Sequence, residues 1–590
     1  MRISTLATHF MLGLLCLAGA SILWQEQAHA AEPQAGNPAN ETCLSCHANQ
    51  DIAAQGADGQ TRQLKVISDK FGKSVHGKRA CVECHTGIKE TSHPAGAAHG
   101  VYAADSAEHQ YWRLAVPDMC GKCHASERAE FASSVHGKEL LENKNLAAAV
   151  CSDCHSPHDV ESPATDGTRL TITQNCGSCH TDSLKSYTGT YHGQVNTLGY
   201  AYTAKCFDCH GSHDIQRVDD PKSSVHADNR LETCQKCHEG ATASFARFEP
   251  HGTAHDFKRY PYIWIASKFM LLLLGGTFAF FWAHSALWFY REYKERKERK
   301  SRPQVKTDTL LDGKLKGKHY QRFPQIWRVA HLIFALSLMT LALTGMSVLY
   351  ADSTWAPVVM HWLGGPQVAA VIHRTCAVLF AIIIFVQLIY FVVHIAQNRR
   401  TFDWFGPNSL TPRLQDVRDI FAMVKWFFGL GPKPVFDRWT YWQKFDYWAP
   451  LGAVIFIGAT GLMLWFPNVT AALLPGWIFN VATMVHGELA LLAVLFLFTV
   501  HFFNNHFRPD KFPLDVVMFT GSMRLEEFKR EHRVEYNRLL ASGELEKYLV
   551  DAPSQPMTLG AKVLGFALIA FGLLLLVFVL IGVAGKVTSG

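Results

Sequence analysis

The stretch Ser74–His85 reads SVHGKRACVECH and places two cysteines and two histidines within twelve residues. It ends in a CxxCH unit, in which two thiols stand one helical turn apart and a histidine follows directly. Each thiol can form a thioether bond to one porphyrin edge, and the histidine can then reach the iron from below. The stretch therefore predicts a covalently attached haem, and its first histidine is a candidate for a second axial ligand.

The CxxCH unit occurs seven times in the polar N-terminal part of the chain. Zinc sites need a second cysteine pair or distant ligands, and disulfide frameworks need no histidine, so neither alternative explains a histidine after every second cysteine. The attachment cysteines are Cys43, Cys46, Cys81, Cys84, Cys120, Cys123, Cys151, Cys154, Cys176, Cys179, Cys206, Cys209, Cys234 and Cys237. The proximal histidines are His47, His85, His124, His155, His180, His210 and His238.

The spacers between units supply seven candidate distal ligands, so we expect seven c haems with two histidines each. The first, third, fifth and seventh units are followed by an HG element, with His76, His136, His192 and His251. The second, fourth and sixth units carry a later histidine of their own, namely His93, His158 and His213. His99, His109, His226 and His255 are held in reserve. Haem with two histidine ligands carries electrons and leaves no open position for substrate. We expect the HG histidine to serve a haem other than its sequence neighbour's.

Six apolar runs in the remainder are long enough to span a bilayer. They cover residues 262–290, 327–350, 367–395, 447–466, 477–503 and 561–584. Basic residues follow the first, third and fifth runs, whereas the loops 351–366 and 468–476 contain no lysine or arginine. By the positive-inside rule the haem c domain and the C-terminus lie outside. A basic, apolar and small-residue pattern in residues 1–30 predicts a signal peptide, which agrees with that orientation.

Four of the histidines inside the apolar runs predict two b haems, because ionisable residues inside a membrane are costly and so suggest function. His486 and His501 share one run and stand fifteen residues apart, about 22 Å along an ideal helix and about 60° out of alignment. By depth, His373 matches His486 near the outer face, and His331 matches His501 near the inner face. His284, His394 and His506 are interpreted as interfacial residues.

The membrane part resembles a known family. RFPQIWRVAHLIF with a following TG, DRWTYWQKFDYWAPLGAVIFIGATGLMLWF and MVHGELALLAVLFLFTVH are similar to the cytochrome b (gamma) subunit of formate dehydrogenases and nickel–iron hydrogenases. The resemblance covers about residues 320–510 and implies the same two ligand pairs, with a quinone bound near one haem. In that family the two-histidine helix is typically one residue shorter between its histidines.

The whole chain resembles the inner-membrane Cbc-type cytochromes of metal-reducing bacteria, which fuse a multihaem cytochrome c to a cytochrome b. The expected fold is an all-α bundle of six spans with two b haems, preceded by a periplasmic domain of short helices and loops wrapped around haems. The expected divisions are a signal peptide at 1–30, a heptahaem domain at 31–258, a first span with its basic exit at 259–300, a di-haem bundle at 301–510, a charged segment at 511–558 and a last span at 559–590.

The resemblance implies a quinol dehydrogenase of the bacterial inner membrane. It would oxidise menaquinol and pass electrons through the b and c haems to a soluble periplasmic cytochrome c in anaerobic respiration. The alternatives are the reverse direction, a terminal oxyanion reductase at an open c haem, and a docking module within a homo-oligomer or larger complex. No nucleotide-binding loop is visible and no nucleic acid is expected, although the net charge is +6.

Three further segments carry predictions. Glu488 is a candidate for proton transfer from quinol or for a hydrogen bond inside the bundle, and Asp437 and Asp446 are the corresponding acids near the inner face. The segment LQDVRDIFAMVKWFFGL is predicted to be an interfacial amphipathic helix with Trp426, Phe427 and Phe428 at the headgroups. The segment MRLEEFKREHRVEYNRLL is predicted to be a solvated charged helix with no chemistry.

Overall fold

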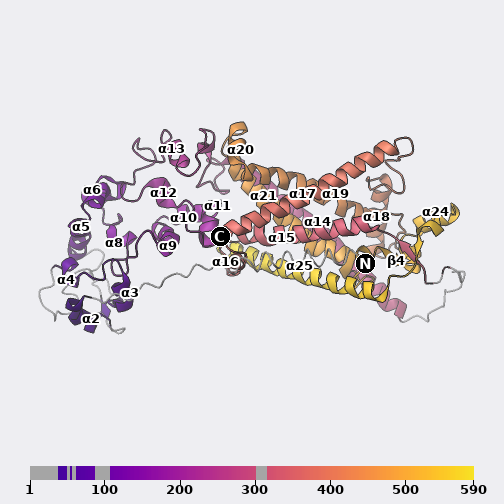
Figure 1. The fold of residues 1–590 in the computed structure, drawn as a ribbon, viewed down its shortest axis with the longest axis horizontal. Coiled ribbons are helices and arrows are strands. Elements are labelled where there is room, and N and C mark those ends of the chain that lie inside the picture. Colours follow the sequence, from indigo (N-terminus) through magenta and orange to yellow (C-terminus); the bar gives the residue numbers. More distant parts are fainter. Residues whose placement is uncertain are drawn as a thin grey trace. The chain divides into compact units, whose positions relative to one another are not determined.

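The computed structural model describes residues 37–48, 53–55, 61–86, 107–300, 315 and 317–589. The predicted signal peptide and His93 and His99 lie outside these residues. The chain divides into two compact units (Figure 1). Unit 1 comprises Met1–His251 with Ala471–Gly476, and unit 2 comprises Gly252–Thr470 with Trp477–Gly590. The first division therefore falls seven residues before the predicted end of the c domain at 258.

Unit 1 is built mainly from short helices. Where the structure describes it, its only strands are a small antiparallel pair, β1 (Ala53–Gln55) and β2 (Thr61–Gln63). Its α-helices are α2 (Glu41–His47), α3 (Ser68–Lys73), α4 (Cys81–Cys84), α5 (Ala107–Gly121), α6 (Ala125–Ser133), α7 (Val135–Leu141), α8 (Cys151–Cys154), α9 (Asp166–Gly177), α10 (Thr181–Thr188), α11 (Tyr191–Thr197), α12 (Cys206–His210) and α13 (Arg230–Gln235). Single 3₁₀ turns are η2 (Pro38–Asn40) and η3 (Phe245–Arg247).

Two of the HG histidines, His136 and His192, lie in the first turn of short helices, and the residues around them explain the motif. Ser134 and Thr190 are N-caps whose hydroxyls accept hydrogen bonds from Gly137 N at 3.0 Å and Gly193 N at 3.2 Å. A Cβ at Gly137 would lie 2.7 Å from the carbonyl carbon of Phe131, closer than a real side chain tolerates. The glycine is thus required by the close approach of two backbone segments, which fixes the direction of the preceding histidine.

Unit 2 contains six helices that are long and apolar enough to cross a membrane, among the residues that the structure describes, so the prediction of six spans is confirmed. Helix α15 packs against α17, and α19 packs against α21 (Figure 1). The spans are α14 (Pro261–Lys300), α15 (Gln325–Leu349), α17 (Pro366–Gln397), α19 (Tyr441–Trp465), α21 (Ile478–Phe496) with its continuation, and α25 (Gln555–Ser589). Short helices α16 (Ala356–Trp362) and α20 (Pro467–Leu473) lie between them in the chain.

The continuation of α21 is not a regular α-helix. It consists of two π-helical turns, η4 (Leu497–His501) and η5 (Phe503–Phe507). A π turn takes about 4.4 residues, or about 82° per residue, because its hydrogen bonds run from i to i+5. Eleven α-helical steps of about 100° lead from His486 to Leu497, and four π-helical steps lead from there to His501. Around the helix axis, His501 then lies about 13° from His486 instead of the predicted 60°. The wider turn therefore absorbs the extra residue and returns both histidines to one face.

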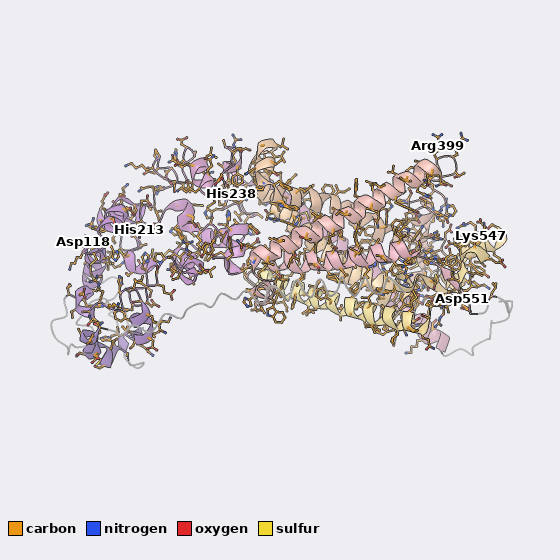
Figure 2. All side chains as sticks on the ribbon, in the orientation of Figure 1. Asp118, His213, His238, Arg399, Lys547 and Asp551 are labelled. Atoms are coloured by element: carbon orange, nitrogen blue, oxygen red, sulfur yellow. The ribbon has the colours of Figure 1, made fainter. Side chains whose placement is uncertain are left out.

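The segments flanking the spans form a small folded subdomain, here called the cap. Its three-stranded antiparallel sheet has the order β4-β3-β5, formed by β3 (His319–Gln321), β4 (Ser522–Arg524) and β5 (Leu549–Val550). Its helices are α22 (Val517–Thr520), α23 (Leu525–Glu531), α24 (Arg533–Ala541) and the 3₁₀ turn η6 (Leu545–Tyr548). Figure 2 marks two of its charged residues, Lys547 and Asp551.

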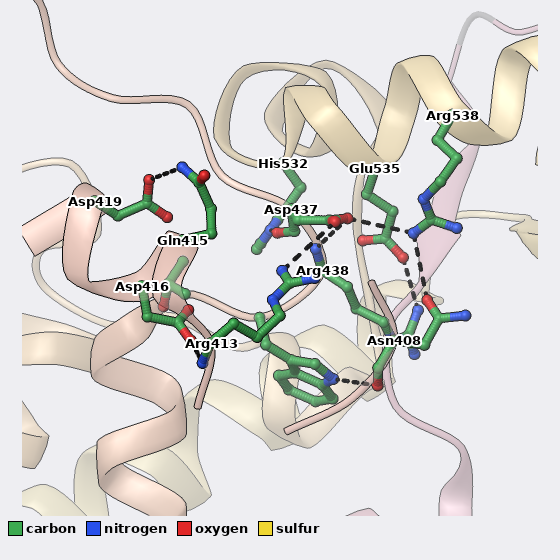
Figure 3. Close-up of polar contacts among 12 residues, drawn as sticks. Asn408, Arg413, Gln415, Asp416, Asp419, Asp437, Arg438, His532, Glu535 and Arg538 are labelled. Atoms are coloured by element: carbon green, nitrogen blue, oxygen red, sulfur yellow. Dashed lines mark hydrogen bonds and ion pairs between the residues drawn. The ribbon is translucent and has the colours of Figure 1, made fainter. Parts of the chain in front are cut away.

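The cap contradicts the prediction of a solvated charged helix. Its apolar side chains form one buried cluster that includes Tyr320, Leu525 and Phe528. Glu535 is only 1% exposed, accepts a hydrogen bond from the Tyr320 hydroxyl at 2.9 Å, and pairs with Arg438 at 2.8 Å (Figure 3 shows the surrounding network). The charged residues of this segment therefore include a buried ion pair, because the partners that neutralise Glu535 come from distant parts of the chain.

Helix α18 (Leu414–Phe427) is amphipathic as predicted, but the prediction that Trp426 and Phe427 lie at the lipid headgroups is wrong. Trp426 and Phe427 are buried against α14 and α19, and the Trp426 indole donates a hydrogen bond to Glu295 at 2.6 Å. Of the three, only Phe428 is exposed. The exposed apolar row of this segment is Leu414, Val417, Phe421, Val424 and Phe428. The large aromatic residues pack inward because the extended α14 offers them an apolar partner.

Candidate haem-binding sites

Six of the seven proximal histidines of unit 1 face a predicted distal histidine. The distances between ring centroids lie between 6.0 and 6.2 Å. The pairs are His85 with His158, His124 with His76, His155 with His213, His180 with His136, His210 with His251, and His238 with His192. Figure 2 marks His213 and His238.

This spacing is the one that a shared metal requires. Two imidazoles that bind one iron from opposite sides, with metal–nitrogen bonds of about 2 Å, have ring centroids about 6 Å apart. Direct packing of two imidazoles would bring the rings closer. The residues therefore fit a haem iron at each pair. By contrast, the described residues contain no group of three or more histidine, cysteine or acidic ligands that suits a zinc ion.

The pairs follow a regular rule that spacing in the sequence does not reveal. Each paired HG histidine before the last one faces the haem site two units further along the chain, as His76 does with His124. Each paired trailing histidine faces the site two units back, as His158 does with His85. The last HG histidine is an exception, because His251 follows the seventh unit and faces His210 of the sixth. The prediction that an HG histidine serves a distant unit thus agrees with the arrangement, and His93 lies outside the described residues.

The ring nitrogens not aimed at the partner are engaged elsewhere in several pairs. His251 Nδ1 lies 2.8 Å from the Ser186 hydroxyl, and His213 Nδ1 lies 3.6 Å from a Glu130 carboxylate oxygen. Such partners fix the ring and leave the other nitrogen for a metal. Burial lowers the pKa of His136 and of His192, so both rings are neutral near pH 7, as iron ligation needs.

Neighbouring CxxCH units lie side by side in the order of the sequence. Thiols of the first and second, third and fourth, and fifth and sixth units interact with each other; the pairs are Cys43 with Cys81, Cys120 with Cys151, and Cys176 with Cys206. The alternate junctions are also close. Burial and then the charge of Cys176 raise the pKa of Cys154 to about 11, and burial and then Cys234 raise that of Cys209 to about 11. The seven sites therefore form one continuous series, and all described cysteines are free.

An acidic residue inside alternate units was missed in the sequence. The second, fourth and sixth units read C-x-[DE]-C-H, with Glu83, Asp153 and Asp208. Each carboxylate accepts a hydrogen bond from the backbone N–H just before the first cysteine, at 2.7, 2.9 and 2.8 Å. This bond starts a one-turn helix at the cysteine itself. The other four units lie at the ends of longer helices, and the acid in the motif could have revealed the alternation.

In unit 2 the structure brings the predicted outer pair together. The rings of His373 on α17 and His486 on α21 have centroids 6.4 Å apart, which again fits a shared iron. His373 Nδ1 lies 2.8 Å from the Thr344 hydroxyl. His486 Nδ1 lies 3.0 Å from the Ile457 carbonyl and 3.2 Å from the Thr460 hydroxyl. Both rings therefore have Nδ1 engaged, which leaves Nε2 for a metal.

The outer site uses the same dipeptide twice. Thr344-Gly345 on α15 contacts His373, and Thr460-Gly461 on α19 contacts His486. A Cβ at Gly345 would meet His373 Cε1 at 3.4 Å, and one at Gly461 would meet His486 Cε1 at 3.1 Å. Each threonine orients a ring, and each glycine gives it room. The two short motifs thus form one symmetrical cradle.

At the inner site, His331 interacts electrostatically with His501 and, more weakly, with His506. His501 Nδ1 lies 3.5 Å from an Asp446 carboxylate oxygen. The other two interfacial histidines are placed differently. His284 Nε2 lies 2.6 Å from the Tyr441 hydroxyl within an aromatic cluster, and His394 is exposed on α17. The structure thus places His331 near His501 and His506, and it places Asp446 beside His501.

The remaining predicted acids have different surroundings. Glu488 on α21 interacts electrostatically with Tyr350 and with Lys586 of the last span. Asp437 pairs with Arg538 at 3.3 Å and Arg413 at 3.8 Å, as Figure 3 shows. These ion pairs hold loops together, so Asp437 serves the cap. Of the predicted acids, Asp446 contacts a candidate haem ligand, His501.

Comparison with known proteins gives one match. Residues 322–505 match the family model described as prokaryotic cytochrome b561. No curated protein and no solved structure matches the chain significantly. With the six apolar helices, the match identifies a membrane-integral protein with an electron-transfer cytochrome b domain, and it implies haem b.

Proposed function

We propose that the chain is a quinol dehydrogenase that passes electrons from menaquinol to a soluble periplasmic cytochrome c, through two b haems and seven c haems. The observation that carries the proposal is the common spacing of opposed imidazoles, 6.0 to 6.2 Å in unit 1 and 6.4 Å at the outer site of unit 2. When bound, haem supplies one-electron transfer without a substrate position at the iron.

The roles of the chain's own residues follow from this arrangement. The paired histidines would hold the haems at fixed spacing, and the attachment cysteines would keep successive sites of unit 1 adjacent. Thr344, Thr460 and Asp446 orient the membrane ligands. Glu488 is the candidate group for accepting a proton from quinol near the outer site, with Tyr350 and Lys586 beside it.

The distribution of charge supports the proposed orientation, because the loops 351–366 and 468–476 contain no lysine or arginine and are expected on the periplasmic side. The basic loops would then face the cytoplasm of a bacterial inner membrane.

The test is a turnover assay with the purified protein, a menaquinol analogue and a soluble c-type cytochrome as acceptor. We expect quinol oxidation coupled to cytochrome reduction in the wild type, and its loss in His373→Ala. His394→Ala on the same helix is the matched control and should keep the activity. Reduction of menaquinone by the dithionite-reduced protein without any quinol oxidation would instead indicate the reverse direction.

A further inference from the structure

The inner ligand His501 has a neighbour that the outer ligands lack. Asp446, in the second turn of α19, places one carboxylate oxygen 3.5 Å from His501 Nδ1, and its side chain is only 11% exposed. The other oxygen, Oδ1, is buried without a hydrogen-bond partner. Asn505 Nδ2, which can only donate, donates a hydrogen bond to the His501 carbonyl oxygen at 2.9 Å and lies 3.2 Å from Nδ1, so of these two neighbours only Asp446 can accept a proton from Nδ1.

The outer site differs in charge. The Nδ1 partners of His373 and His486 are the hydroxyls of Thr344 and Thr460 and the backbone carbonyl of Ile457, all of which are neutral. A carboxylate that takes the N–H of a metal-bound imidazole makes the ring a stronger donor, which favours the oxidised metal. A neutral acceptor does so much less.

We propose that Asp446 is a positioning residue that holds the Nδ1 proton of His501 and keeps the reduction potential of the inner haem site below that of the outer one. The proposal rests on the proposed function for the presence of haem at both sites. With this order of potentials, one electron at the inner site moves to the outer site spontaneously, and no proton needs to move with it. The asymmetry built into the ligand surroundings thus favours electron transfer from the inner to the outer site, which is the order that quinol oxidation near the inner face requires. A quinol oxidised beside Glu488 would instead deliver its electron to the outer site directly.

The experiment is a potentiometric titration of the b absorption band in the His373→Ala background, in which the outer haem is absent. Redox mediators replace quinol and acceptor, so the result does not depend on which substrate the protein uses. In this background Asp446→Asn is compared with Asp446→Glu and with Asp551→Asn, whose carboxylate lies in the cap and is 90% exposed. Haem content and the low-spin electron paramagnetic resonance spectrum are recorded for each.

We expect Asp446→Asn to favour the reduced inner haem by about tenfold, a rise of about 59 mV for one electron. Asp446→Glu should restore the parent potential, and Asp551→Asn should leave it unchanged. An Asp446→Asn protein that keeps its haem and titrates like the parent would overturn the proposal. Loss of the inner haem in both Asp446 variants would also overturn it, because it would assign Asp446 to folding. Absence of b haem from the His373→Ala protein itself would instead count against the proposed ligands.

Discussion

Removal of His76 should alter a haem site that lies two units away and leave the adjacent site intact. His76 stands five residues before Cys81, but its ring faces His124, with centroids 6.1 Å apart. His85, the proximal ligand of the adjacent unit, faces His158 instead. His76→Ala should therefore convert the iron bound at Cys120–Cys123 from low spin to high spin. That is one site of the seven.

The assay is electron paramagnetic resonance of the oxidised protein, with the high-spin signal integrated against total haem c. We expect about one-seventh of the c haem in the signal, since each histidine pair serves one iron. Adding Cys120→Ser and Cys123→Ser should remove the signal together with the affected haem. Adding Cys81→Ser and Cys84→Ser should leave it. The reverse result for these two backgrounds would refute the pairing rule.

A matched control is present in the chain. His226 lies in SSVHADN, which mimics the HG element but lacks its glycine. Its Nδ1 contacts an Asp228 carboxylate oxygen at 3.4 Å, and no ring contact pairs it with a described proximal histidine. His226→Ala should therefore give no high-spin signal, because its ring faces no proximal histidine among the residues that the structure describes.

Three other changes have expected outcomes. Glu535→Ala leaves two arginines around a buried site without their carboxylate. We therefore expect the free energy of unfolding of the cap, measured by denaturant titration, to fall by about 3–5 kcal/mol. The exposed control Glu546→Ala should cost far less. Burial, and then the charge of Arg322, lowers the pKa of His532 from 6.5 to about 3. As the pH falls, His532 is protonated in the unfolded chain at a higher pH than in the folded cap. The cap should therefore lose about 1.4 kcal/mol of stability per pH unit between about pH 6.5 and 3, measured as faster hydrogen exchange. His532→Gln should abolish that part of the slope. Thr344→Val should speed haem b loss about fivefold, for about 1 kcal/mol, whereas Thr460→Val should have less effect because His486 keeps the Ile457 carbonyl. Equal effects of the two threonine variants, or a pH slope that persists in His532→Gln, would contradict the assigned contacts.

The features that sequence predicted well are local ones. A run of apolar residues identifies a span by its own composition, so all six were found, with end positions that differ by one to eight residues. The CxxCH spacing likewise carries its chemistry within five residues. The HG glycines were recognised as a pattern, but the reason for them, a backbone approach at residues such as Gly137, depends on the folded neighbours.

The features that sequence missed depend on distant partners. Glu535 was assigned to a solvated helix because its neighbours in the sequence are charged, yet the residues that neutralise it lie 213 and 97 positions away. The pairing of His76 with His124 skips one whole unit and has no local signal. The π turn at Leu497–His501 was hidden because the helical angle was counted as if every turn were regular.

The most direct test of quinol-driven electron transfer is anaerobic mixing of the purified, oxidised protein with a menaquinol analogue, while the b and c absorption bands are followed separately. If electrons enter through the histidine pairs of the membrane domain, the b band should be reduced first and the c band should follow. In His373→Ala the c band should stay oxidised. Reduction of the c band at the same rate in both proteins, or before the b band, would contradict the proposed path.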